Sequence, residues 1–107
     1  MKYISTVEKA IKEINFLQEF VLLAKDYQDI TLEQRIIKLY AYEGSINEVT
    51  KIINTELSKN GEQIIDSVFV SNVIQSKPMD SLHKILRMNY MNKTKHIRKK
   101  SSKKISY

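Results

Sequence analysis

The sequence is poor in the residues that carry disulfides, thiolate chemistry and tight turns. None of its 107 residues is Cys, which excludes disulfides, a thiolate zinc site and a cysteine nucleophile. Two Gly and one Pro are too few for the many turns of a β-rich fold. The longest run without a formally charged residue is ten, at 67–76, about half of a membrane span. We therefore expect a soluble, all-α protein that does not enter a membrane.

Charge is distributed unevenly along the chain. Residues 1–80 contain nine Lys or Arg and all twelve Asp and Glu, which gives a net charge of −3. Residues 81–107 contain nine Lys or Arg and no acidic residue, which gives +9. A basic end of this kind typically binds polyanions, mostly nucleic acid. The alternative is a solvated tail that only keeps the protein in solution.

The N-terminus lacks a secretory pattern, because charged residues begin at Glu8 and Lys9. Fifteen Lys against three Arg, with fifteen Ile, are typical of an AT-rich genome. We therefore expect the protein in the cytoplasm of a low-GC bacterium or of a phage-infected cell.

Helix-start signals divide the first half of the chain. Ser5, Thr31 and Ser45 are each followed three residues later by Glu or Gln, the pattern of a capping box. Apolar residues recur at helical spacing after each of these caps. Gly44 is placed to end the second helix in the left-handed conformation. Three helices are therefore predicted between residues 5 and 58.

Two more helices are predicted in the second half. The connection at 58–65 contains a turn signal at Asn60-Gly61, and 63–65 can pass through β geometry. Asp66 or Ser67 can cap a helix that runs to Gln75, although its β-branched residues would also suit a strand. Pro78 can begin a fifth helix, which is expected to fade after residue 91. We thus predict a domain at 1–92 of about five helices and a disordered basic tail at 93–107.

The first predicted helix carries two apolar stripes. This face is too broad for one neighbour, so either the helix is embedded in the core or one stripe meets a second subunit. One stripe consists of Val7, Ile11, Ile14, Leu17, Val21 and Ala24. The stripe that we assign to homodimerisation consists of Phe16, Phe20, Leu23 and Tyr27.

The sequence offers little for catalysis. His83 and His96 are its two histidines, and their spacing of thirteen matches no common metal-ligand pattern. It contains neither a Gly-rich phosphate loop nor a nucleophile elbow. We expect no enzyme, no cofactor and no metal site, and we expect His83 to be a surface or packing residue.

The segment 44–78 has the plan of a helix-turn-helix. A capped helix at 45–57 is followed by a connection and a second capped helix at 66–75, as in proteins that place the second helix in the major groove. Asn and Gln can pair with adenine, and Ser can reach bases or phosphates. The alternative is a plain helical hairpin with polar side chains that keep it soluble. The base-reading candidates are Ser67, Ser71, Asn72 and Gln75.

Phosphate contacts would have to come from outside this second helix. It has no Lys or Arg, whereas phosphate neutralisation dominates the affinity for DNA. The connection is also longer than the three or four residues of the usual turn. The phosphate-binding candidates are Lys51, Lys59, Lys77, Lys84, Lys93, Lys95, Arg98, Lys99, Lys100, Lys103 and Lys104.

The run GSINEVTKIINTELSKNGEQIIDSVFVSNVIQSKP resembles the extended-turn helix-turn-helix of the DNA-binding region in large serine recombinases. The resemblance covers about a third of the chain, and it implies a mode of DNA binding without recombinase activity, since 107 residues hold no catalytic serine domain. The matching residues are Gly44-Ser45, Val49, Ile53-Asn54, Gly61, Val70-Ser71 and Val73-Ile74.

These observations favour a small DNA-binding protein, a bacterial or phage transcriptional regulator that binds double-stranded DNA as a homodimer. A second hypothesis is a protein-interaction module, an inhibitor or adaptor of a host complex. A third is RNA binding through the tail, with Tyr90 and Tyr107 as stacking residues.

Overall fold

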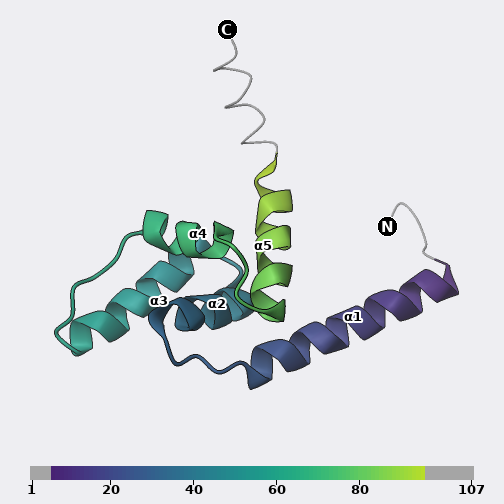
Figure 1. Cartoon of the computed structure of the whole chain (residues 1–107), viewed down its shortest axis with the longest axis horizontal. Coiled ribbons are helices and arrows are strands. Elements are labelled where there is room, and N and C mark those ends of the chain that lie inside the picture. Colours follow the sequence, from purple (N-terminus) through teal and green to yellow (C-terminus); the bar gives the residue numbers. More distant parts are fainter. Residues whose placement is uncertain (1–5, 96–107) are drawn as a thin grey trace, which may run out of the picture.

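The computed structural model describes residues 6–95, which form five helices and no strand. This confirms the predicted all-α class. Helices α2 to α5 pack together as the body of the molecule, and α1 extends away from it (Figure 1). The helices are α1 (Val7–Asp26), α2 (Leu32–Glu43), α3 (Ile46–Lys59), α4 (Ser67–Gln75) and α5 (Ser81–Lys93).

The ends of α2 and the start of α3 follow the predicted local signals. Thr31 and Gln34 form the complete capping box of α2, with the Gln34 backbone N–H donating to the Thr31 hydroxyl at 3.1 Å. Gly44 ends α2 with φ 67°, and its N–H donates to the Tyr40 carbonyl at 2.9 Å. The Ser45 hydroxyl then caps α3 by accepting from the Glu48 N–H at 3.3 Å. A left-handed residue between the helices turns the chain sharply, and Gly adopts that conformation without a Cβ penalty.

Two predicted helix starts are wrong. Helix α1 is capped by Thr6 instead of Ser5, which lies outside the described residues, because the Thr6 hydroxyl accepts from the Lys9 N–H at 3.3 Å. Helix α5 begins after Asp80 and not at Pro78. The Asp80 carboxylate accepts from the His83 N–H at 3.0 Å. Its negative charge at the N-terminus of α5 also interacts favourably with the positive end of the helix dipole.

The hydrophobic core lies between α2, α3, α4 and α5. Burial of its Ile, Val and Leu side chains is the main favourable contribution to folding, about 1.5–3 kcal/mol for each. The core residues are Ala24, Ile36, Ile37, Leu39, Tyr40, Val49, Ile53, Val70, Ile74, Leu82 and Leu86. The imidazole of His83 is fully buried among them, so the packing alternative for this residue holds and the surface alternative does not.

Of the two alternatives for α1, embedding in the core is wrong. Ala24 is its one buried residue, and Phe20, Leu23 and Tyr27 pack against the core only partly buried. The Tyr27 hydroxyl donates to the Asp80 carboxylate at 2.7 Å and so joins the end of α1 to the start of α5. Because contact with the body is confined to its C-terminal half, the rest of α1 projects past the body (Figure 1).

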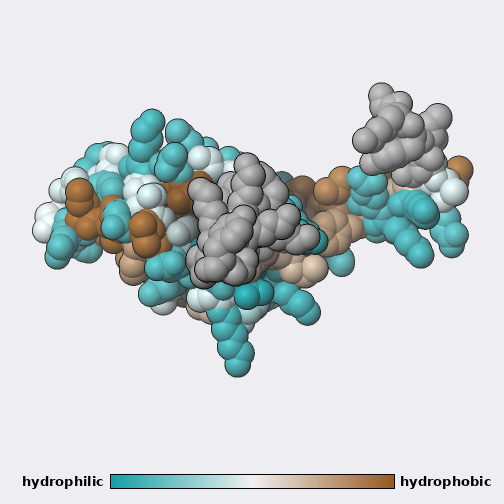
Figure 2. Space-filling model, turned by 90° about the horizontal axis from the view of Figure 1, so that it is seen from above, coloured by the Kyte–Doolittle hydropathy of each residue, from teal (hydrophilic) through white to brown (hydrophobic). Residues whose placement is uncertain are grey.

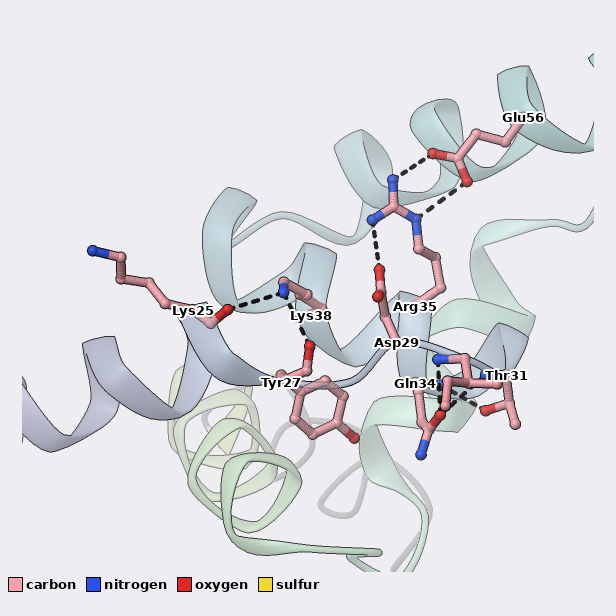
Figure 3. A network of polar contacts seen from close by, with 9 residues as sticks. Lys25, Tyr27, Asp29, Thr31, Gln34, Arg35, Lys38 and Glu56 are labelled. Carbon is pink, nitrogen blue, oxygen red and sulfur yellow. Dashed lines mark hydrogen bonds and ion pairs between the residues drawn. The ribbon is translucent and has the colours of Figure 1, made fainter.

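A network of charged side chains fixes the link between α1, α2 and α3 (Figure 3). The Arg35 guanidinium donates to both oxygens of Glu56, at 3.2 and 2.6 Å, and to Asp29 at 2.9 Å. The hydrogen bond to Glu56 raises the pKa of Arg35 more than burial lowers it. The Lys38 ammonium donates to the carbonyls of Lys25 and Tyr27, at 3.3 and 3.0 Å, and so satisfies the open end of α1.

Candidate nucleic-acid interface

The end of α3 is a Schellman motif. Gly61 has φ 69°, and its N–H donates to the Ser58 carbonyl at 3.1 Å. The N–H of Glu62 reaches back to the Leu57 carbonyl at 2.9 Å. These two bonds stop the helix and satisfy carbonyls that would otherwise lack partners. The turn signal at Asn60-Gly61 therefore acts as a helix stop, and the chain leaves α3 as the extended connector 60–66.

The connector is held by one side chain of α3. The Asn54 amide donates to the Ile65 carbonyl at 2.8 Å, and its oxygen accepts from the Ile65 N–H at 2.9 Å. Residues 63–65 form no strand, and no strand forms elsewhere within residues 6–95. The amide of Asn54 takes the place of a neighbouring strand by serving both backbone groups of Ile65.

Helix α4 begins directly after the pair of hydrogen bonds between Asn54 and Ile65, which we call the clamp. The Asp66 carboxylate caps it by accepting from the Phe69 N–H at 2.9 Å. Val70 and Ile74 are fully buried four residues apart, so one side of α4 is locked against the body. The helical alternative for this segment is therefore confirmed, because burial at a spacing of four outweighs the strand preference of its β-branched residues.

The predicted base-reading residues do not share one environment. Asn72 is exposed, whereas Ser67, Ser71 and Gln75 are half-buried. The Ser71 hydroxyl donates to the Val68 carbonyl at 3.1 Å and is therefore already engaged within the helix. Helical spacing places Asn72 opposite the buried side of α4, Ser71 and Gln75 between the two sides, and Ser67 toward the body.

Sequence reasoning missed Val68 as a member of this outward surface. Its side chain is 61% exposed, and residues 68, 71, 72 and 75 follow the i, i+3, i+4, i+7 pattern of one helix face. That pattern was the available signal, but Val68 reads as a core residue when judged by hydrophobicity alone. An exposed aliphatic side chain beside Asn72 can contact a thymine methyl group or an apolar protein surface.

The predicted phosphate-binding lysines within residues 6–95 come from α3, from the connection between α4 and α5, and from α5 and its end. Lys59, Lys77, Lys84 and Lys95 are exposed, and Lys51 is paired with Glu48 at 3.6 Å. The Lys93 ammonium donates to the Gly44 carbonyl at 3.3 Å and thereby ties the end of α5 to the start of α3. The remaining candidates lie outside the described residues: Arg98, Lys99, Lys100, Lys103 and Lys104.

Acidic residues stand close to α4. Asp66 caps its N-terminus, and Glu33 from α2 lines a surface hollow together with Phe69 and Asn72. Because the Asp66 carboxylate already occupies the positive end of α4, that end is not open to a phosphate. Any electrostatic attraction for DNA must therefore come from the lysines beyond α4.

The joint between α4 and α5 is built from backbone carbonyls of α4. The Arg87 guanidinium donates to the Gln75 carbonyl at 2.9 Å. One ring nitrogen of His83 lies 3.1 Å from the Ile74 carbonyl, and the other accepts from the Met79 N–H at 3.1 Å. A carbonyl only accepts, so the first nitrogen is the one that donates. The start of the basic segment is thus rigidly attached to α4.

The residues assigned to dimerisation lie mainly against the chain's own body. Phe20, Leu23 and Tyr27 pack on the core, and Phe16 is half exposed beside α5. Homodimerisation itself stays a prediction.

Within residues 6–95 no cluster of three or more His, Cys, Asp or Glu could hold a metal ion, and no helix there is both long and apolar enough to cross a membrane.

The chain has no significant match among protein-family models, curated proteins or solved structures. The resemblance of residues 44–78 to serine recombinases therefore stays a hypothesis based on the sequence pattern and is not an assignment to a family.

Proposed function

We propose that this chain is a DNA-binding protein of a bacterium or phage, with α4 entering the major groove of double-stranded DNA. The observation that carries the proposal is the placement of α4. Val70 and Ile74 lock its inner side, and Asn72 and Val68 stand on its outer side. Helix α5 packs beside α4 (Figure 1), and it begins the acid-free segment 81–107, whose net charge is +9.

Reading and affinity would be divided between these parts. The Asn72 amide can pair with adenine, and Val68 can contact the methyl group of a neighbouring thymine. Lys77 and Lys84 would contact phosphates, and the basic end would supply most of the attraction. This division also explains how α4 can act without a Lys or Arg of its own and next to Glu33. Regulation of transcription is the function that fits a small protein of this design.

The salt dependence of binding to a random-sequence duplex tests the electrostatic part. The triple variant Lys99→Gln, Lys100→Gln, Lys103→Gln should bind more weakly, with a salt slope smaller by about 2–3, since each phosphate contact contributes about 0.9. The matched control Lys2→Gln, Lys9→Gln, Lys12→Gln removes the same charge at the other end of the chain and should change the slope little. Equal slopes for the two variants would exclude the basic end from the mechanism.

Base reading by α4 is tested separately. A binding site is first selected from a random duplex library with the unaltered protein. Asn72→Ala should then lower the preference for this site by about 1–3 kcal/mol and leave binding to random duplex unchanged. Asn47→Ala, an exposed change on α3, is the control. If both variants keep the preference, α4 does not read the sequence.

A second candidate function rests on the apolar side chains around α4. Ile64 and Val68 are 57% and 61% exposed, and brown patches appear at the end of the body that holds the connector and the start of α4 (Figure 2). Exposed aliphatic side chains this close together are typical of a protein interface. Absence of duplex binding at low salt, with loss of a co-purifying host protein in Val68→Glu, would favour this function over DNA binding. Preference for an RNA pool over duplex DNA would favour RNA binding.

A further inference from the structure

The face of α1 that points away from the body is apolar along most of the helix. Its residues are 50–77% exposed, and Figure 2 shows hydrophobic side chains along the part of α1 nearest the body. We call this surface the open face; it consists of Val7, Ile11, Ile14, Leu17, Val21 and Leu22.

A comparison with the opposite side of α1 shows that packing on the body does not explain why the open face is apolar. That side follows residues 9, 13, 16, 20, 23 and 27, one stripe of helical spacing. It is apolar where the body lies, at Phe20, Leu23 and Tyr27, and polar where α1 has left the body, at Lys9 and Glu13. The open face instead stays apolar out to Val7, far from any part of the body. An apolar stripe that extends beyond the body of its own chain is typical of a surface that binds another molecule.

Hollows along one edge of the open face extend the apolar surface toward the body. One lies between α1 and α5, where Leu17 and Phe20 face Ile85 and Met88. Another lies between α1 and α2, where Val21 and Ala24 face Tyr42. A rod that lies along the open face can therefore also contact the body at this edge.

A second α1 helix fits the shape of this surface. Helix α1 has 20 residues and so is about 30 Å long, much of it beyond the body. A rod of equal length covers the whole stripe, and the two copies together would bury on the order of 1,000 Å², about the minimum for a biological interface. In an antiparallel pair Ile14 of each copy lies opposite Leu17 of the other, and Ile11 lies opposite Val21.

Charge and geometry favour the antiparallel arrangement. Lys25 continues the stripe of the open face past Val21, and in an antiparallel pair it meets the end of the other helix that carries Glu8. A parallel pair would instead place Lys25 opposite Lys25. Each body packs on the C-terminal half of its α1, so in an antiparallel pair the two bodies lie at opposite ends.

A membrane surface fits this helix less well. Interfacial helices carry polar faces rich in Lys and Arg, which attract anionic lipid. Helix α1 has four acidic and three basic residues, a net charge of −1.

We propose that the chain forms a homodimer through antiparallel pairing of the open faces of two α1 helices. The occupant of the open face is a second copy of this chain, and the two-fold axis crosses the helices between Ile14 and Leu17. The pairing is independent of DNA, so it holds or fails apart from the proposed function.

Sedimentation equilibrium of the full chain at micromolar concentration tests the dimer. The unaltered protein should have twice the chain mass of 12.6 kDa, and Ile14→Glu should have the mass of one chain. The control Ile30→Glu places the same charge at another exposed apolar residue, 83% exposed and outside the open face, and should stay dimeric. Circular dichroism checks that the body stays folded in each variant. A monomeric unaltered protein, or a dimeric Ile14→Glu, would overturn the proposal.

The absence of Cys in the sequence allows a clean test of direction by cross-linking. One preparation carries Val7→Cys and the other Lys25→Cys, and the two are mixed in equal amounts and oxidised. The antiparallel pair predicts disulfides between the two kinds of chain and few within either kind. Disulfides formed mainly between two Val7→Cys chains would show a parallel pair and contradict the proposed arrangement. Binding of the unaltered chain to anionic vesicles as a monomer would contradict it as well.

Discussion

The side-chain amide of Asn54 binds both backbone groups of Ile65, with N–O distances of 2.8 and 2.9 Å. The two residues are eleven positions apart, and between them the chain leaves α3, turns at Gly61 and extends toward α4. This one side chain therefore determines where α4 begins relative to α3. The connector is longer than the usual turn of a helix-turn-helix. Because Asn54 holds it, α3 and α4 can still be rigidly arranged.

Asn54→Ala should lower the free energy of unfolding by about 1–3 kcal/mol, because it leaves the N–H and carbonyl of Ile65 without partners in a partly buried position. Urea denaturation measures the change. Asn47→Ala, which removes an exposed amide from the same helix, should change the stability by less than about 0.5 kcal/mol. Equal effects of the two substitutions would contradict the clamp.

His83→Leu should destabilise the body by about 2–4 kcal/mol, although it replaces a polar core residue with an apolar one. The substitution fills the space but removes the partners of the Ile74 carbonyl and the Met79 N–H. Thermal and urea unfolding measure the loss. Lys84→Ala at the exposed neighbouring position serves as the control. A stability equal to that of the unaltered chain would show that these two bonds contribute nothing.

The stability of the fold should decrease at alkaline pH through Tyr27. Burial, the hydrogen bond to Asp80 and the Asp80 charge all raise the pKa of the Tyr27 phenol above its ordinary value of about 10. Since the folded pKa is the higher one, the unfolded chain loses this proton first. The contribution of Tyr27 is therefore complete below about pH 10 and declines as the pH rises above it.

Tyr27→Phe removes this group and should make the free energy of unfolding fall less steeply between about pH 9 and pH 11. Tyr42→Phe, at an exposed tyrosine, should leave the steep decline in place. Burial raises the pKa of Tyr40 as well, so part of the decline should persist in both variants. Urea denaturation across this pH range provides the comparison. An unchanged decline in Tyr27→Phe would contradict the role of Tyr27.

Local signals predicted the elements of the fold well and their starts less well. Thr31 with Gln34, Gly44 and Ser45 act as predicted, because a cap is made between residues only three or four positions apart. The errors at Ser5 and Pro78 arose where two neighbouring residues could each start a helix. Helix α5 starts after Asp80 and not at Pro78. The Asp80 carboxylate caps α5 and also accepts a hydrogen bond from Tyr27 at the end of α1.

The candidate site was predicted only in outline. Asn72 lies exposed on α4, but Ser71 is bonded to its own helix and Ser67 is half-buried. Val68 was missed because it was judged by its hydrophobicity and not by its helical spacing from Ser71, Asn72 and Gln75. Which side of a short helix is buried depends on the neighbours that pack against it, and these come from distant parts of the chain.

The sequence by itself determined the helical class, most helix caps and the division into an acidic part of −3 and a basic end of +9. These properties depend on composition, on periodicity and on bonds between near neighbours. Only the tertiary structure decided that α1 lies mostly outside the core, that His83 is buried and that Asn54 holds Ile65. Each of these depends on surfaces brought together by folding. Both stripes of α1 are apolar at its C-terminal half, and the position of the body decides which one is covered there.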